Sequence, residues 1–145
     1  MTRIVLDASV FLASLIAEGP TRGILLGHGD LEFYAPEVVV VEIKKHLPMV
    51  IKRTGKPRDV VETLLKDILT NVQVIPTEIF VLALPAARER AKRAHADNDE
   101  AYVALADVLS APIWTYDKDF RRIQGVSAVS TSEVEHLAEG ALPPP

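Results

Sequence analysis

Residues 97–120, "DNDEAYVALADVLSAPIWTYDKDF", carry more information on the fold than any other stretch of the chain. An acid-rich turn precedes the mostly apolar segment 100–109, which is typical of a helix covered by the rest of a protein. Residues 113–116 are apolar or β-favouring and predict a buried strand. Asp117 and Asp119 follow this strand, two residues apart. Like charges placed this closely destabilise a fold unless a cation holds them together.

The remainder of the chain repeats this alternation of strands and helices. Further strands are expected at residues 3–6, 32–35, 72–75 and 126–129. Helices are expected at residues 8–17, 21–26, 58–70, 77–94 (divided or kinked at Pro85) and from 131 onward, and a short helical turn at 117–124. Strands that alternate with helices predict an α/β fold, a three-layer α/β/α sandwich with a mostly parallel central sheet.

One segment gives conflicting signals. Pro36 suits the first position of a helix, and Glu37 would lie in its favoured first turn. Residues 38–41 are four consecutive valines, which favour a strand. The residues alone leave both alternatives open for the segment 36–47.

Length and composition limit the possible classes of protein. The 145 residues suit one domain, here residues 1–140, followed by a Pro-rich tail, 141–145, that we expect to be disordered. Cysteine is absent, which excludes disulfides and thiolate metal sites. The apolar residues 4–17 are interrupted by Asp7, are too short to span a membrane and lack a signal-peptide pattern. We therefore expect a cytoplasmic protein with no membrane association.

Four acids stand at positions that one crevice would gather. Asp7 and Asp117 directly follow two predicted strands, Asp99 precedes a predicted helix, and Glu42 lies in the ambiguous segment. Parallel strands end at one edge of their sheet, where ligands bind. With no suitable His or Cys, these carboxylates suit Mg²⁺ or Mn²⁺. Ser9 and Thr115, each two residues from an Asp, suit hydroxyl hydrogen bonds that orient the carboxylates. Helix capping by Ser9 and an ordinary strand position for Thr115 explain these residues equally well.

Each acid also has a purely structural interpretation. Asp7 can cap a helix beginning at residue 8, and Glu42 can pair with Lys45 on a helix surface. Asp97 and Asp99 compete for one capping position, and Asp119 can be a first-turn acid. The net charge of −4 argues against unspecific nucleic-acid binding. A basic run that includes Lys44 and Lys45 is compatible with steering a phosphate backbone or with a solvated helix face.

Three stretches in order, "IVLDASVFLASL", "APEVVVVEIKKHL" and the opening quotation, resemble PIN-domain ribonucleases of the kind found as VapC toxins in toxin–antitoxin pairs. The resemblance covers nearly the whole chain and favours a helix at residues 36–47. It implies Mg²⁺- or Mn²⁺-dependent cleavage of single-stranded RNA, with Asp7, Glu42, Asp99 and Asp117 as catalytic acids. By the same resemblance, Asp7, Asp99, Asp117 and the more variable Asp119 would bind metal. The third motif usually has paired acids before its helix, and Asn98 separates them here, so Asp97 remains the alternative to Asp99.

The resemblance also implies partners: an RNA substrate, a protein antitoxin over the acidic crevice, and a second copy of the chain in a homodimer. Lys118, between two acids, is a candidate phosphate contact together with Lys44 and Lys45. A haloacid-dehalogenase-type phosphotransferase needs an acid where Ser9 stands, and a receiver domain needs an acidic neighbour of Asp7, so both are disfavoured. A PIN-like domain that binds RNA or protein without cleaving, and a housekeeping PIN nuclease, remain alternatives.

Overall fold

In the computed structural model, which describes residues 1–27 and 29–140, five parallel strands form one sheet in the order β3-β2-β1-β4-β5. The strands are β1 (Thr2–Leu6), β2 (Leu31–Pro36), β3 (Val72–Ile75), β4 (Ile113–Trp114) and β5 (Ala128–Val129). Register joins Val5 of β1 to Tyr34 of β2 and to Ile113 of β4. The α/β prediction with a parallel sheet is confirmed.

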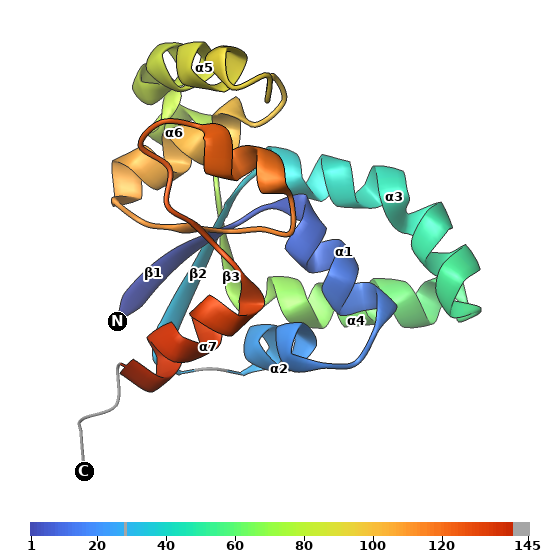
Figure 1. Cartoon of the computed structure of the whole chain (residues 1–145). Coiled ribbons are helices and arrows are strands. Elements are labelled where there is room, and N and C mark those ends of the chain that lie inside the picture. Colours follow the sequence, from blue (N-terminus) through green and yellow to red (C-terminus); the bar gives the residue numbers. More distant parts are fainter. Residues whose placement is uncertain (28, 141–145) are drawn as a thin grey trace.

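Helices cover the sheet on both sides (Figure 1). They are α1 (Ala8–Ile16), α2 (Pro20–Leu26), α3 (Val38–Thr54), α4 (Arg58–Leu69), α5 (Leu84–Arg93), α6 (Glu100–Leu109) and α7 (Thr131–Gly140), with 3₁₀ turns η1 (Thr77–Ile79), η2 (Val81–Ala83) and η3 (Lys118–Arg122). Helix α6 packs on β1, β2 and β4, with α5 outside it, whereas α1, α2 and α4 pack together on the other side.

The buried strand residues explain this layering. Ile4, Val5 and Leu6 of β1 are all fully buried, as expected for a strand with helices on both faces. Trp114 of β4 is also fully buried and lies 6.2 Å, between ring centroids, from Phe33 of β2. The central strands are therefore held by apolar contacts from both layers.

Several expected boundaries were wrong. Pro36 is the last residue of β2, and α3 begins at Val38 and continues through Pro48. The segment 77–94, expected to be a helix divided or kinked at Pro85, is divided just before that residue: two 3₁₀ turns precede α5, and Pro85 lies in the first turn of α5, where its missing N–H costs nothing.

The last two strands are shorter than expected, because only Ile113 and Trp114 pair with Ala128 and Val129. The tail, 141–145, lies outside the described residues. Within the described chain no single helix is long and apolar enough to cross a membrane, although the bent pair α1–α2 reaches that length and composition jointly.

The strand order places a topological switch between β1 and β4. The chain moves from β1 outward to β2 and β3, and then returns to add β4 and β5 on the other side of β1. At such a switch the connections leave neighbouring strands in opposite directions and open a crevice at their carboxyl ends. Asp7 follows β1 at this point and Thr115 follows β4.

Candidate active site

Asp7 is a buried carboxylate, only 5% exposed, at the N-cap of α1. Its Oδ1 accepts hydrogen bonds from the backbone N–H of Ser9 at 3.0 Å and from the Ser9 hydroxyl at 2.5 Å. Its Oδ2 accepts a hydrogen bond from Thr115 Oγ1 at 2.7 Å. Burial raises the pKa of Asp7 above its usual range, and these hydrogen bonds oppose that shift. The cap interpretation of Asp7 is therefore correct, and it leaves open a second role.

Thr115 connects Asp7 to Asp117. The hydroxyl that donates to Asp7 also accepts a hydrogen bond from the backbone N–H of Asp117 at 2.8 Å. The exposed Asp117 side chain accepts the N–H of Asp119 at 2.9 Å and caps η3. Thr115 thus fixes the Asp7 carboxylate, which follows β1, relative to the backbone of Asp117, which follows β4.

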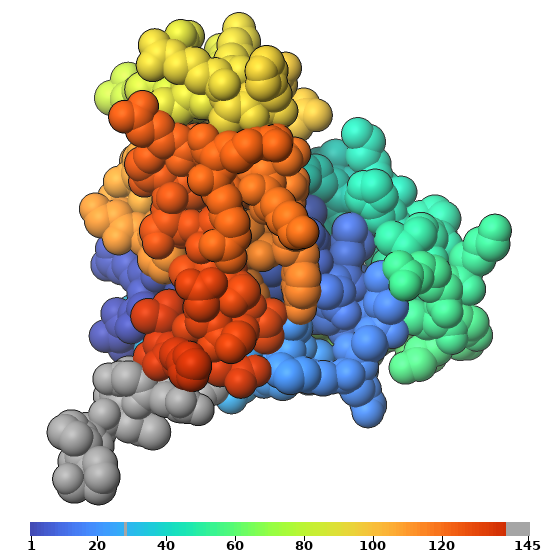
Figure 2. All heavy atoms as spheres, in the orientation of Figure 1, coloured from blue at the N-terminus to red at the C-terminus, as the bar shows by residue number. Residues whose placement is uncertain are grey.

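Asp99 is the carboxylate on which the charges of four other acids act. Burial, followed by the charges of Asp117, Asp7, Asp119 and Glu42, raises the pKa of Asp99 to about 7. It occupies the N-cap position of α6, but its side chain makes no capping hydrogen bond. In Figure 2 the blue segment after β1 is visible between the orange segment after β4 and the cyan helix α3. The charges of the acids in these segments all act on Asp99.

Glu42, on α3, reaches the same neighbourhood beside Tyr102 of α6. Burial and then the charge of Glu42 raise the pKa of the Tyr102 phenol, which is protonated at neutral pH even at its usual pKa. The Tyr102 hydroxyl is buried and lacks a hydrogen-bond partner of normal length among the described residues. A protonated phenol facing carboxylates can donate a hydrogen bond to a group that enters the crevice.

The other expected site residues are dispersed. Asp97 is exposed and is not among the charges that act on Asp99. Asp119 does act on Asp99, but it also forms an ion pair with Arg122 at 2.5 Å. Lys118 is exposed beside Asp117, whereas Lys44 lines a separate groove between α3 and α4 and Lys45 is exposed on α3.

The pattern of the PIN domain family matches residues 5–139. The chain belongs to the PIN domain family. No curated protein matches significantly. Solved structures share the fold: VapBC2 from Rickettsia felis bound to a promoter DNA fragment (12% identity, TM-score 0.70, 89% of this chain and 98% of that one) and FitAcB from Neisseria gonorrhoeae (22%, 0.66, 89% and 98%). PAE2754 from Pyrobaculum aerophilum is also similar (15%, 0.66, 97% and 89%).

The carboxylates of this PIN domain are near one another without forming a closed cage. Across residues 1–27 and 29–140, no three His, Asp or Glu side chains stand as a group that could hold one metal ion in the conformation described. The donor set is nonetheless all carboxylate oxygen, the ligand type of Mg²⁺ and Mn²⁺. Burial and then the neighbouring carboxylates raise the pKa of Asp99, so a cation beside it would favour its charged form. The donor type of these residues fits a hard divalent cation, whereas the described conformation does not bring three of them together.

Sequence reasoning missed the residues that hold the turn after β4. The Tyr116 hydroxyl is hydrogen-bonded to Thr21 of α2 at 2.5 Å and to Thr131 of α7 at 3.0 Å. Thr131 also accepts the indole N–H of Trp114 at 3.1 Å. The backbone N–H of Tyr116 donates to Ser9 Oγ at 3.0 Å. Thr21 lies 95 residues away, so no local pattern points to this contact.

Tyr102 could have been found, because it lies one helical turn after Asp99.

Proposed function

We propose that this PIN domain is a divalent-metal-dependent endoribonuclease that cleaves single-stranded RNA. The observation that carries this proposal is the half-buried position of Asp99 among four further carboxylates; burial and then these charges raise its pKa to about 7. Such a cluster is unfavourable for folding unless it serves a cation. The resemblance to VapC-type PIN ribonucleases supplies the substrate class.

Asp7, Asp99, Asp117 and Asp119 would hold Mg²⁺ or Mn²⁺, with Glu42 completing the acidic crevice. When bound, the ion lowers the pKa of a water and stabilises charge that develops on the phosphate. Ser9 and Thr115 keep the Asp7 carboxylate in one orientation through three hydrogen bonds. The Tyr102 hydroxyl can donate a hydrogen bond to a substrate or water oxygen in the crevice.

A cleavage assay on single-stranded RNA with Mn²⁺ tests the proposal. Asp7→Asn and Asp99→Asn should each reduce the cleavage rate at least about 100-fold, the scale of losing one preorganised electrostatic contact to the transition state. Asp97→Asn is the matched control, because Asp97 lies two residues from Asp99 but is exposed and outside the cluster. It should cleave at nearly the wild-type rate.

Three results would contradict the proposal: cleavage by Asp7→Asn at the wild-type rate, cleavage by the wild type in excess EDTA, or loss of cleavage in Asp97→Asn alone. RNA binding without cleavage by the wild type under all metal conditions would favour the non-cleaving alternative.

The proposed biological role is the toxin of a type II toxin–antitoxin pair. The support is the VapC resemblance together with the fold shared with the VapBC2 and FitAcB structures. We expect an adjacent small gene that encodes a DNA-binding protein. That protein should co-purify with the chain and inhibit it. Growth unaffected by overproduction of the active protein would favour a housekeeping nuclease instead.

A homodimer is also part of the proposal. The η1–η2 segment exposes the apolar side chains Ile79, Val81 and Leu82, of which Leu82 is 95% exposed. Apolar surface of this kind is stabilised when a second copy covers it. Sedimentation of the wild type and of Leu82→Glu should give a dimer and a weakened dimer, respectively. A monomeric wild type would contradict this part.

A further inference from the structure

A small hollow of about 180 Å³ lies directly beside Asp117. Tyr116, Asp117, Lys118, Arg121 and Ser130 line it, together with Thr115. A water's share of liquid volume is about 30 Å³, so the hollow has room for roughly six waters. This is enough for a phosphate group.

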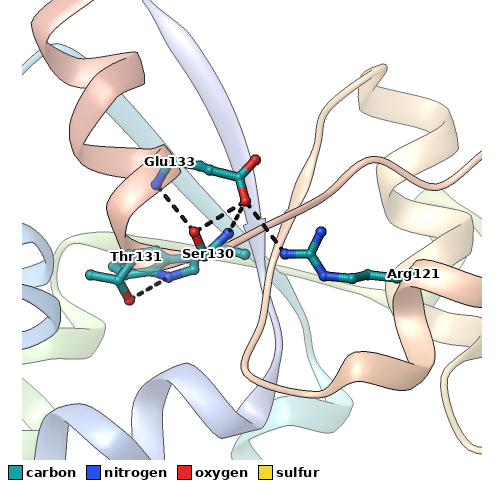
Figure 3. A network of polar contacts seen from close by, with 5 residues as sticks. Arg121, Ser130, Thr131 and Glu133 are labelled. Atoms are coloured by element: carbon teal, nitrogen blue, oxygen red, sulfur yellow. Dashed lines mark hydrogen bonds and ion pairs between the residues drawn. The ribbon is translucent and has the colours of Figure 1, made fainter.

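Two cationic side chains border this hollow, Lys118 and Arg121. Arg121 forms an ion pair with Glu133 at 3.4 Å, and both side chains are about half exposed (Figure 3). An exposed ion pair of this kind contributes little free energy because water screens it and its side chains lose freedom. Arg121 can therefore exchange Glu133 for another anion at small cost.

Glu133 does not depend on Arg121 for its position. Its carboxylate accepts hydrogen bonds from the backbone N–H of Ser130 at 3.2 Å and from the Ser130 hydroxyl at 3.1 Å. The Ser130 hydroxyl in turn accepts the N–H of Glu133 at 3.2 Å, which completes a capping box at the start of α7 (Figure 3). The carboxylate would remain in place if Arg121 left it.

We propose that this hollow binds an RNA phosphate next to the one positioned at the acidic cluster, with Arg121 and Lys118 as its cations. Glu133 pairs with Arg121 in the RNA-free protein, so it competes with the phosphate for the Arg121 guanidinium. This inference rests on the proposed function, since it assigns to the same RNA a second contact beside Asp117. It orients the strand along the turn after β4 rather than along the groove that Lys44 lines.

The test measures binding of a fluorescently labelled short single-stranded RNA to Asp7→Asn protein, in which cleavage does not interfere. Adding Arg121→Ala should raise Kd about five- to tenfold at low salt and reduce the slope of log Kd against log salt by about 0.7, the share of one phosphate contact on a single strand. Arg58→Ala is the matched comparison, because Arg58 also forms a half-exposed pair, with Glu62 at 3.2 Å, and lines the groove of Lys44, so it reports on the rival path of the RNA.

Glu133→Gln provides a change of opposite sign. Glutamine preserves the capping box, so α7 should remain intact by circular dichroism. Because the Glu133 charge no longer competes for Arg121, the variant should bind RNA about two- to fivefold more tightly. A purely structural ion pair predicts no tightening.

Equal effects of Arg121→Ala and Arg58→Ala, weaker binding by Glu133→Gln, or no RNA binding by any variant would overturn this inference. RNA cleavage by the wild type without these differences would overturn this inference alone. The expected differences in a protein that never cleaves RNA would instead overturn the proposed nuclease function alone.

Discussion

Asp99 illustrates at the scale of one residue how the site opposes stability. A helix N-cap aspartate normally stabilises its helix through a side-chain hydrogen bond, and Asp99 makes none. Its burial and the four surrounding carboxylates instead raise its pKa from 3.8 to about 7. A residue that makes no capping hydrogen bond, and whose charged form is destabilised by its surroundings, is a candidate functional residue.

The raised pKa predicts a pH dependence of stability in metal-free protein. Between about pH 4 and 7 the folded state holds a proton on Asp99 that the unfolded state has lost, so the free energy of unfolding falls as pH rises through this interval and stays low above it. Asp99→Asn should reduce this fall by on the order of 1 kcal/mol, a value discounted because solvent screens a half-buried group.

Urea denaturation in EDTA at several pH values between 4 and 8 measures this effect. Asp97→Asn should retain the wild-type fall, because Asp97 is exposed. Part of the fall in the free energy of unfolding should persist in Asp99→Asn, since the pKa of Asp7 is raised as well. Identical pH profiles for wild type and Asp99→Asn would contradict the prediction.

At the scale of elements, α3 shows packing overriding local preference. Its four consecutive valines favour a strand, and Pro48 lies inside the helix, yet residues 38–54 are helical. Val39, Ile43, Leu47 and Val50 are all buried at helical spacing. The free energy from burying this face exceeds the local preference of the valines and the hydrogen bond lost at Pro48.

Pro48→Ala should therefore stabilise the protein. Alanine restores the N–H that can bond the Lys44 carbonyl, a gain of up to about 3 kcal/mol in a helix interior, less about 0.4–1 kcal/mol for a more flexible unfolded chain. We expect a net gain of about 2 kcal/mol in the free energy of unfolding, measured by urea denaturation.

Pro57→Ala is the matched comparison. Pro57 has φ −59° at the N-cap of α4, which suits proline, so its replacement should cost a few tenths of a kcal/mol. Equal effects of the two substitutions would mean that Pro48 does not strain α3.

At the scale of the whole molecule, the strand order assembles the site. Asp7, Glu42, Asp99 and Asp117 come from four segments, and β1 and β4 meet only because the chain returns to the centre of the sheet after β3. Each acid is anchored in a different element. Binding of a cation to all of them should therefore stabilise the complete fold rather than one helix.

Mn²⁺ should raise the melting temperature of the wild type. At roughly a hundred times its Kd, a ligand stabilises by about 2.7 kcal/mol, which corresponds to about 5–10 °C for a domain of about 150 residues. Asp99→Asn should show a much smaller shift, and Asp97→Asn the full shift. Scanning fluorimetry with and without Mn²⁺, reversed by EDTA, measures this. An equal shift in all three proteins would indicate binding elsewhere.

The sequence by itself determined the α/β class, most element positions and the expectation that acids after parallel strands lie near each other. These features depend on periodicity and on local residue preference, which are encoded within a few residues. The ends of β4 and β5 were less predictable, because a strand end depends on which residues find a partner strand.

The resemblance favoured Asp99 over Asp97, and only the tertiary structure shows that the two acids before the same helix differ in burial. Only the fold brings Thr21 and Thr131 to the Tyr116 hydroxyl, and Arg121 to Glu133 beside Asp117. Such contacts join segments that are distant in the chain. Their geometry follows from the strand order and the packing of the layers, which no local pattern encodes.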